Sequence, residues 1–263
     1  MTGLKGLNAV ITGSTSGIGL GIARGLAESG MNVVINGMES AEEKQAISKQ
    51  IEADSGVKAP VIDADLTMGA EARGLIEQAL DSLGSVDVLV NNAGVQHVSR
   101  VEEFPDEKWD QIINLNLSAS FHTTKAALPG MRQQGYGRII NIASAHGLVA
   151  SPYKSAYVAA KHGVVGLTRT IGLEVAEEPD LTVNAICPAY VRTPLVEGQI
   201  ADQAKAHGMS EEQVIRDVIL AAQPNKRFVT IDELVAFTRL LCSHEGRSFN
   251  GAALPMDGAW TAR

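Results

Sequence analysis

The sequence predicts an α/β protein in which a doubly wound parallel sheet carries helices on both faces. β-prone segments alternate with segments of helical periodicity along most of the chain. A glycine-rich turn lies between the first β-prone segment and the first helical one. Of the 263 residues, 45% are hydrophobic but only 4% are aromatic, so the core must use the aliphatic side chains that suit buried parallel strands. We expect a single domain over residues 1–263, because no repeat or Pro/Ser-rich linker divides the chain.

The elements follow one another in the order that parallel crossovers require. Residues 7–12 are a short β-prone run, and the helix that follows at 18–29 has Ile18, Ile22 and Leu26 at helical spacing. The further expected strands cover residues 32–36, 59–63, 86–90, 138–143, 182–186 and 252–256. The further expected helices cover residues 41–53, 70–83, 108–133, 155–175 and 231–242. Residues 194–223 have the pattern of one or two amphipathic helices interrupted by Gly208, and we predict that this helical insertion is a mobile substrate lid.

Charge and composition exclude several classes of protein. The net charge of −8 opposes binding to the phosphate backbone, so we expect no nucleic-acid partner. Cys187 and Cys242 lie far apart without metal-ligand spacing, which indicates reduced thiols and no metal site. No run of about 18 apolar residues and no signal-peptide core is present, so we expect a cytoplasmic protein without a membrane segment.

The glycine-rich turn is a candidate site for a dinucleotide. Gly13, Gly17 and Gly19 are spaced as G-x-x-x-G-x-G, and Thr15 and Ile18 lie between them. Between a strand and a helix, such glycines let the backbone approach a pyrophosphate at the helix N-terminus. A plain glycine turn is the alternative, which the placement between a strand and a helix makes less attractive. The expected fold is therefore Rossmann-like.

The end of the second strand bears on the choice between NAD and NADP. An NAD site usually has an acid there, but the sequence reads Asn36-Gly37-Met38, with Glu39 two residues after the expected position. No Arg or Lys is present there or in the glycine turn to meet a 2′-phosphate. The missing cation favours NAD as the cofactor.

Two further segments follow predicted strands at the edge where open α/β sheets bind ligands. Asp65 and Leu66 are positioned to meet the adenine, and Asn92, Ala93 and Gly94 to line the ribose. A helix N-cap and a simple turn are the respective alternatives.

The catalytic candidates are a tyrosine and a lysine four residues apart. Tyr157 and Lys161 lie on one face of a predicted helix, and Ser144 follows the strand before it. A free phenol has a pKa near 10, and we expect the Lys161 cation, the positive nicotinamide and hydrogen bonds together to lower it enough for acid/base work. Tyr157 would then exchange a proton with an alcohol or ketone while a nicotinamide carries the hydride, and Ser144 would hold the substrate oxygen. An amphipathic Tyr beside a solvated Lys is the alternative.

With these residues in place, the chain resembles the short-chain dehydrogenase/reductase family over almost its full length. The resemblance rests on Thr-Gly-x-x-x-Gly-Ile-Gly at 12–19, Asn-Asn-Ala-Gly at 91–94, Asn116, Ser144, Tyr157 and Lys161. It implies that Asn116 kinks a helix and holds water in a proton relay from Lys161, and that Val191 and Thr193 face the nicotinamide. It also implies a homotetramer built partly on helix 155–175, for which internal packing is the alternative. Two positions depart from the family pattern, Pro188-Ala189 in place of Pro-Gly and Gly37 in place of Asp.

Within that family the chain resembles the bacterial D-3-hydroxybutyrate dehydrogenases, through residues 141–151, 154–157 and 260–263. The similarity implies that the carboxylate of 3-hydroxybutyrate or acetoacetate binds to Gln96, His146, Lys154 and Gln199. A carboxylate entering a protein of net charge −8 needs a local cation, which Lys154 supplies. Tyr190 and Trp260 are candidates to cover the methyl end of the substrate. Singly, Lys154 could be a solvated helix-start residue, His146 a loop histidine, and the two aromatic residues ordinary core.

Two other functions stay open. The chain could be a related reductase of another small keto acid or of a ketoacyl thioester, although we see no basic entry surface for a thioester. It could also be a non-catalytic dinucleotide-binding regulator, against which the intact Ser144, Tyr157 and Lys161 argue.

Overall fold

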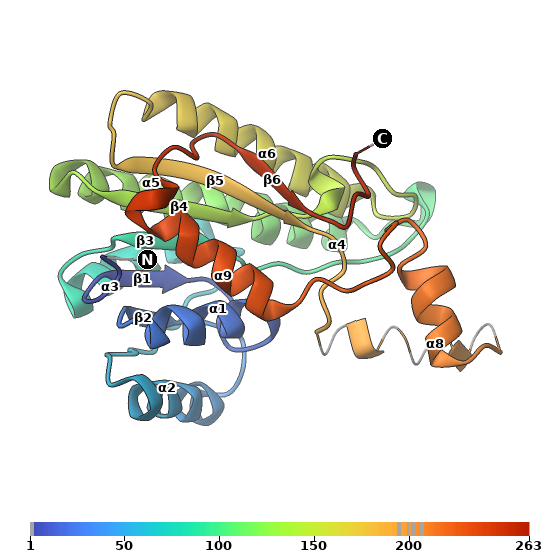
Figure 1. The fold of residues 1–263 in the computed structure, drawn as a ribbon, viewed down its shortest axis with the longest axis horizontal. Helices are drawn as coiled ribbons and strands as arrows, with labels where there is room; N and C mark the ends of the chain where they lie inside the picture. The colour runs from blue at the N-terminus through green and yellow to red at the C-terminus, as the bar shows by residue number, and fades with distance from the viewer. Residues whose placement is uncertain (1–2, 194–195, 199, 201–203, 206–207, 263) are drawn as a thin grey trace.

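The computed structural model describes residues 3–193, 196–198, 200, 204–205 and 208–262 (Figure 1). Its strands are β1 (Asn8–Ile11), β2 (Asn32–Ile35), β3 (Val88–Asn91), β4 (Gly137–Ile142), β5 (Leu181–Pro188) and β6 (Ala253–Met256). Its helices are α1 (Gly17–Glu28), α2 (Ala41–Ser55), α3 (Gly69–Leu83), α4 (Asp106–Ile113), α5 (Ala119–Gln134), α6 (Ser155–Glu174), α8 (Glu211–Val214) and α9 (Ile231–Cys242). The predicted α/β class is confirmed.

The six strands form one parallel sheet in the order β2-β1-β3-β4-β5-β6. The chain leaves β1 toward β2 on one side and later returns to place β3 on the other side. The strand order therefore reverses between β1 and β3, and a reversal of this kind opens a crevice at the carboxyl ends of the strands.

The prediction of a strand at 59–63 is wrong. This segment lies beside β2, but it joins the sheet only through an isolated bridge between Ile35 and Val61. Pro60 accepts a hydrogen bond from the Ile35 N–H but has no N–H of its own to continue a ladder. The segment therefore covers the sheet edge without becoming a strand.

Helices cover both faces of the sheet, and two apolar cores result. Ile22, Leu26 and Leu234 from α1 and α9 belong to the core on one face, where these two helices lie side by side (Figure 1). Leu75, Met131 and Ile171, from α3, α5 and α6, belong to the core on the other face. All six side chains are buried, so the doubly wound arrangement brings an aliphatic surface against each face of the sheet.

The expected helix at 108–133 is interrupted. α4 and α5 are joined by a π-helical turn at Asn114–Ser118, and Asn116 lies at its centre with only 2% of its surface exposed. A π turn carries one extra residue, so it changes the direction of the following helix and leaves a backbone carbonyl outside the regular pattern. The sequence prediction placed a kink here through Asn116.

The insertion at 194–223 has its own small apolar cluster. Gly208 interrupts it with φ +61°, and α8 continues into a second π-helical turn at Ile215–Ile219. Figure 1 shows α8 at one end of the molecule, away from the sheet. Buried members of the cluster are Val196, Ile200, Val214, Ile219 and Leu220, and Tyr190 packs against it.

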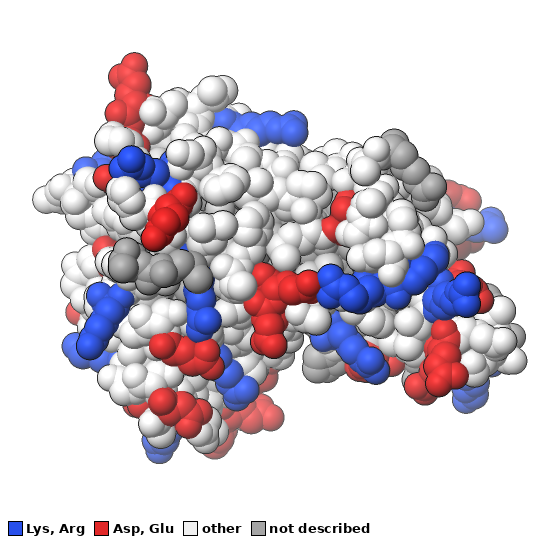
Figure 2. Space-filling model, viewed as in Figure 1, with Lys and Arg blue, Asp and Glu red and all other residues white. Residues whose placement is uncertain are grey.

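The surface carries both signs of charge. Figure 2 shows Lys and Arg side chains interspersed with Asp and Glu on the face in view, with no single large basic area. None of the helices in the described part of the chain is long and apolar enough to span a bilayer. No group of His, Cys, Asp and Glu side chains with metal-binding geometry occurs among the described residues.

Candidate active site

A cavity of about 550 Å³ lies at the carboxyl ends of the strands, where the strand order reverses. It collects nearly all of the predicted site residues, although they come from segments far apart in the sequence. The predicted residues that line it are Gly13, Thr15, Gly17, Ile18, Asp65, Leu66, Asn92, Ala93, Gly94, Gln96, Ser144, His146, Lys154, Tyr157, Lys161, Tyr190, Val191, Thr193 and Trp260.

Three predicted residues are not among these lining residues. Gly19 lies beneath the glycine turn, where a Cβ would overlap the Gly13 carbonyl. Asn116 is buried in the π-helical turn behind the cavity wall. Gln199 lies outside the described residues, so its predicted role has no structural account.

The glycine turn fits a pyrophosphate. Gly13 and Gly17 have φ values of +63° and +51°, which favour glycine because L side chains rarely adopt them. Ser16, the residue before α1, makes no side-chain cap, and the first residues of this helix line the cavity. Backbone N–H groups at a helix N-terminus attract anions, so this end of the cavity can receive the diphosphate of a dinucleotide.

The loop after β3 is tied to the glycine turn. The Asn92 side chain donates to the carbonyls of Thr12 and Gly13, at 3.0 and 3.1 Å. The backbone N–H groups of Asn92 and Ala93 donate to the Thr12 hydroxyl. Asn92 therefore holds two walls of the cavity together, which is a structural task beside its predicted contact with the ribose.

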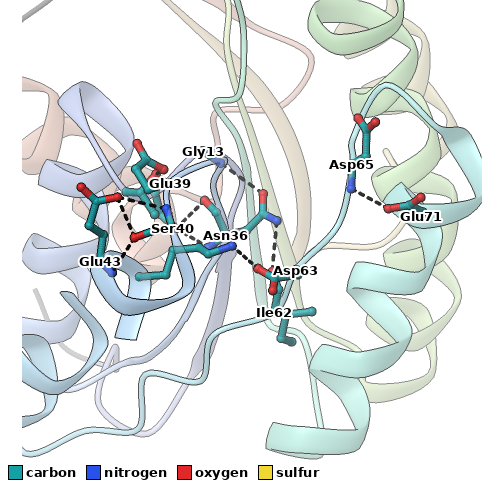
Figure 3. Close-up of polar contacts among 12 residues, drawn as sticks. Gly13, Asn36, Glu39, Ser40, Glu43, Ile62, Asp63, Asp65 and Glu71 are labelled. Atoms are coloured by element: carbon teal, nitrogen blue, oxygen red, sulfur yellow. Dashed lines mark hydrogen bonds and ion pairs between the residues drawn. The ribbon is translucent and has the colours of Figure 1, made fainter. Parts of the chain in front are cut away.

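The end of the cavity next to the glycine turn, where the sequence prediction places the adenosine, contains Asp65 and one acid that the prediction did not assign. Asp65 accepts hydrogen bonds from the N–H and hydroxyl of Thr67, and these lower the pKa of the Asp65 carboxyl. Glu39, labelled in Figure 3, also lines this end, and its carboxylate accepts a hydrogen bond from the Thr15 hydroxyl. Motif comparison does not assign Glu39, because it lies two residues after Gly37, the usual position of the acid. The presence of an acid so close to that position was the one indication in the sequence.

Asn116 lies in the π-helical turn, and its side chain forms hydrogen bonds with the backbone of Val95. The side-chain oxygen accepts from the Val95 N–H and the side-chain nitrogen donates to the Val95 carbonyl, both at 2.9 Å. Gly94 packs closely against the same side chain, since a Cβ there would lie 3.2 Å from it. Asn116 thus positions the loop that carries Gln96 into the cavity.

Ser144, Tyr157 and Lys161 meet at the other end of the cavity. Ser144 follows β4 and accepts a hydrogen bond from the His146 N–H at 3.1 Å. Tyr157 and Lys161 lie one turn apart on α6, with the Lys161 Nζ 5.6 Å from the centre of the Tyr157 ring. The same ammonium donates to the Ile142 carbonyl at 2.7 Å. Burial lowers the pKa of Lys161 to about 8, against an opposing effect of Cys187.

In the chain alone the pKa of Tyr157 lies above its ordinary value, whereas the predicted lowering also depends on the charge of the nicotinamide. Burial raises the pKa of the phenol, and its hydrogen bond with Ser144 lowers it only in part. Lys161 does not dominate because its ammonium points to a backbone carbonyl and faces the ring from 5.6 Å. The phenol therefore holds its proton at neutral pH and is suited to donate it to a ketone oxygen.

Four side chains surround the space next to Tyr157. His146 makes edge-to-face contacts with Tyr157 and Trp260, at centroid distances of 6.2 and 5.1 Å. Trp260 is stacked with Tyr190 at 6.2 Å, and the Lys154 Nζ lies 5.8 Å from the Tyr190 ring. Burial lowers the pKa of Lys154. The result is a small aromatic compartment with one cation at its wall.

His146 is uncharged in this compartment. Burial, followed by the nearby Lys154 charge, lowers the pKa of His146 to about 4. Its Nδ1 atom is buried and has no hydrogen-bond partner within the described chain. A buried polar atom without a partner is costly, so this nitrogen is suited to hydrogen-bond a ligand.

The two positions that the family resemblance predicts to face the nicotinamide lie between these two ends. Val191 is 5% exposed and pairs with Val229 in an isolated bridge. Thr193 approaches Gly17, since a Cβ on that glycine would lie 3.6 Å from the threonine methyl group. Both residues line the cavity between the glycine turn and Tyr157.

A cavity that can receive a dinucleotide along its length, with an acid/base side chain at one end, has what alcohol–ketone oxidation and reduction require. The protein is an oxidoreductase of the class that uses a nicotinamide dinucleotide. It belongs to the short chain dehydrogenase family, which matches residues 7–204.

Relatives are similar over nearly the whole chain. A D-beta-hydroxybutyrate dehydrogenase of Rhizobium meliloti (strain 1021) is 52% identical over 97% of this chain and 98% of its own length. One from Cupriavidus necator is 49% identical over 99% of this chain and 100% of its own length. A 3-oxoacyl-(acyl-carrier-protein) reductase of Staphylococcus epidermidis is 33% identical over 95% of this chain and 97% of its own length.

Proposed function

We propose that the protein interconverts (R)-3-hydroxybutyrate and acetoacetate, with NAD as the hydride carrier. The observation that carries the proposal is Lys154, a half-buried cation three residues before Tyr157 in the same cavity. A substrate carboxylate at Lys154 would place the rest of a four-carbon acid beside the phenol. The two relatives named D-beta-hydroxybutyrate dehydrogenase, at 52% and 49% identity, support this substrate.

Each residue at this end has a chemical task. Tyr157 donates its proton to the ketone oxygen in reduction and takes the alcohol proton in oxidation. Ser144 holds the substrate oxygen by a hydrogen bond, and Lys161 supplies the charge that assists proton loss from Tyr157. When bound, the nicotinamide accepts or returns the hydride. We expect the π-helical turn at Asn116 to hold the water that connects Lys161 to solvent.

The carboxylate would be bound by one charge and several neutral groups. Lys154 provides the charge. Neutral His146, Gln96 and, from the insertion, Gln199 donate hydrogen bonds to the carboxylate. Tyr190 and Trp260 cover the methyl end. This division follows from the pKa of His146, about 4, which leaves the ring uncharged at neutral pH.

NAD is the proposed cofactor because the adenosine end lacks a cation. Among the described residues that line the cavity, Lys154 and Lys161 are the only Lys or Arg side chains, and both lie near Tyr157. A 2′-phosphate at the opposite end would face acids without a neutralising partner.

The test is the formation of reduced nicotinamide, followed by its near-ultraviolet absorbance, with each enantiomer of 3-hydroxybutyrate and with an uncharged secondary alcohol. We expect turnover of the (R) enantiomer with NAD. Turnover of the uncharged alcohol together with none of either acid enantiomer would refute the substrate.

Two variants separate the proposed roles. Tyr157→Phe should abolish turnover of every substrate. Lys154→Ala should lower kcat/KM for the acid by roughly tenfold to a hundredfold, since a hydrogen bond to a charged group contributes about 1.5–3 kcal/mol. Its effect on an uncharged alcohol should be small. Lys49→Ala, at an exposed site on α2, is the control, and equal losses for both substrate types in Lys154→Ala would contradict the assignment.

A second candidate activity is reduction of a ketoacyl thioester. The 33% identical relative named 3-oxoacyl-(acyl-carrier-protein) reductase favours it. The aromatic compartment formed by His146, Tyr190 and Trp260 argues for a smaller substrate. Faster NADH consumption with acetoacetyl thioester than with acetoacetate would make this activity the main one.

Two further proposals concern the chain as a whole. We propose that residues 194–223 close over bound substrate, since their apolar cluster includes Tyr190 of the substrate compartment. We also propose a homotetramer, for which the exposed Trp109, Phe121 and Leu173 on α4, α5 and α6 are the supporting features. A monomer in light scattering at micromolar concentration would contradict the tetramer.

A further inference from the structure

The loop between β2 and α2 brings an acid to the adenosine end by an unusual route. Gly37 belongs to this loop and lines the cavity, and the space around it leaves no room for a side chain. A Cβ at Gly37 would overlap the Thr15 hydroxyl and crowd the Glu39 carboxylate. The space next to the end of β2 is therefore filled by side chains that arrive from the glycine turn and from two residues further along the loop.

Glu39 occupies that space with a defined orientation. The Thr15 hydroxyl, on a residue only 7% exposed, donates to Glu39 Oε2. This bond joins the loop after β2 to the glycine turn, and Figure 3 shows Glu39 near Gly13 and Asn36, which follow β1 and β2. Within the described residues no other hydrogen bond to the Glu39 carboxylate is found, so Oε1 is left for a ligand.

The charges around Glu39 add to the negative charge at this end of the cavity. Asp65 lines the same end of the cavity on the opposite side (Figure 3). Lys44, a cation from α2, forms an ion pair with Asp63 and is 7% exposed, so its charge is already engaged. A phosphate entering between Glu39 and Asp65 would meet two carboxylates in a partly enclosed space, where charges interact more strongly than in water.

We propose that Glu39, positioned by Thr15, is the residue that binds the adenosine ribose hydroxyls and discriminates against a 2′-phosphate. Glu39 would bind the ribose in place of an acid directly at the end of β2, because a side chain at position 37 would overlap the Thr15 hydroxyl. The assignment rests on the proposed use of NAD and names the residue responsible for it.

Binding measurements test the assignment without relying on turnover. The wild-type protein and Glu39→Gln are titrated with NADH and with NADPH, and the fluorescence of the reduced nicotinamide gives each Kd. We expect Glu39→Gln to bind NADH more weakly and NADPH more tightly, so that the NADPH:NADH ratio of Kd values falls by at least about tenfold. That fold-change is typical for the loss of a hydrogen bond to a charged group.

Glu43→Gln is the matched control. It removes the same charge from the same region, but Glu43 bonds to Ser40 at the start of α2 and does not line the cavity. Glutamine preserves this capping arrangement, so the helix should be retained. We expect the Kd ratio of Glu43→Gln to stay within about twofold of wild type, because an exposed charge at this distance is largely screened.

Thr15 variants test the positioning role. Thr15→Ser keeps the hydroxyl and should retain the wild-type Kd ratio, whereas Thr15→Val should lower it toward that of Glu39→Gln. An unchanged ratio in Glu39→Gln, or equal changes in Glu39→Gln and Glu43→Gln, would overturn the role of Glu39 while leaving NAD as the cofactor. Tighter binding of NADPH than NADH by the wild-type protein would instead overturn the proposed cofactor.

Discussion

At the scale of single residues, the sequence spacing of Tyr157 and Lys161 predicts their location but not their contacts or their pKa values. The four-residue spacing of Tyr157 and Lys161 correctly placed both on one side of α6 and in one cavity. The spacing could not predict that Lys161 would donate to the Ile142 carbonyl, because that contact depends on how α6 lies on β4. Burial therefore acts on both groups, raising the pKa of Tyr157 and lowering that of Lys161.

The first prediction concerns the stability cost of this buried lysine. The pKa of Lys161 falls from 10.5 to about 8 on folding. Below pH 8 the side chain is charged in both states and the cost is fully present. Between pH 8 and 10.5 the folded state releases its proton first, so stability rises with pH. The free energy of unfolding of wild type relative to Lys161→Met should rise by up to about 3 kcal/mol between neutral pH and the top of that window.

Urea unfolding at several pH values measures this difference. Comparing the change with pH, rather than one value, removes the constant cost of losing the hydrogen bond to Ile142. Lys125→Met, at an exposed position of α5, is the control for removing a charge that is not buried. A pH-independent difference between wild type and Lys161→Met would show that Lys161 keeps its ordinary pKa.

The second prediction concerns His146, which we expect to act as a neutral hydrogen-bond donor. Its pKa of about 4 means that its charge does not change between pH 6 and 8. His146→Gln should therefore retain most of the affinity for acetoacetate, whereas His146→Ala should raise KM by about tenfold. Steady-state kinetics across that pH range provide the measurement. A wild-type KM that rises in step with deprotonation of a group near pH 6.5 would contradict a neutral His146.

At the scale of elements, periodicity and composition predicted almost every helix and strand, and the two exceptions have local causes. Pro60 reduces the segment at 59–63 to a single bridge because it lacks an N–H. The π-helical turn at Asn114–Ser118 is invisible to a periodicity of 3.6, since apolar spacing on both sides of it stays helical. Only resemblance to a family pointed to Asn116, and its two bonds to Val95 could not be read from the sequence.

The third prediction concerns this π-helical turn. Asn116→Ala removes both hydrogen bonds to the Val95 backbone and leaves its N–H and carbonyl without these partners. We expect a loss of about 2–3 kcal/mol in the free energy of unfolding and a lower kcat, because the loop leading to Gln96 loses its anchor. Chemical denaturation and steady-state kinetics measure the two effects. Asn114→Ala, at an exposed position of the same turn, should change neither. Equal effects of the two variants would show that the loss does not come from the two hydrogen bonds to Val95.

At the scale of the whole molecule, the cavity depends on contacts between segments that are far apart in the sequence. The C-terminal turn places Trp260 against His146 and Tyr190, and Asp257 holds that turn by accepting bonds from the N–H and hydroxyl of Thr261. Motif spacing identified Ser144, Tyr157 and Lys161, while the position of Trp260 depends on a reverse turn over a hundred residues later. The role of Glu39 likewise depends on space that only the folded Gly37 and Thr15 define.

The fourth prediction tests that long-range contact. Trp260→Ala should enlarge the substrate compartment, raise KM for 3-hydroxybutyrate by about tenfold and relax the preference for short acids over longer 3-hydroxy acids. The Kd for NADH should stay within about twofold of wild type, because Trp260 lies at the substrate end. Val101→Ala, which also removes an exposed apolar side chain, is the control. An unchanged chain-length preference would remove Trp260 from the specificity determinants.

The prolines at the two margins of the sheet affect how the protein behaves when it is concentrated. Pro60 lies in the segment that covers β2, and Pro255 lies in β6, the last strand on the opposite side. An exposed strand edge can add strands from another molecule and so begin aggregation, but it needs a continuous row of N–H donors to do so. Pro255 interrupts that row on one side, because its neighbour Met256 faces β5 and Pro255 therefore faces outward. On the other side, Pro60 faces β2 and prevents a regular strand at 59–63, so an irregular segment covers the edge of β2. The residue that makes 59–63 a poor strand thus also leaves no regular strand at that margin for another molecule to extend.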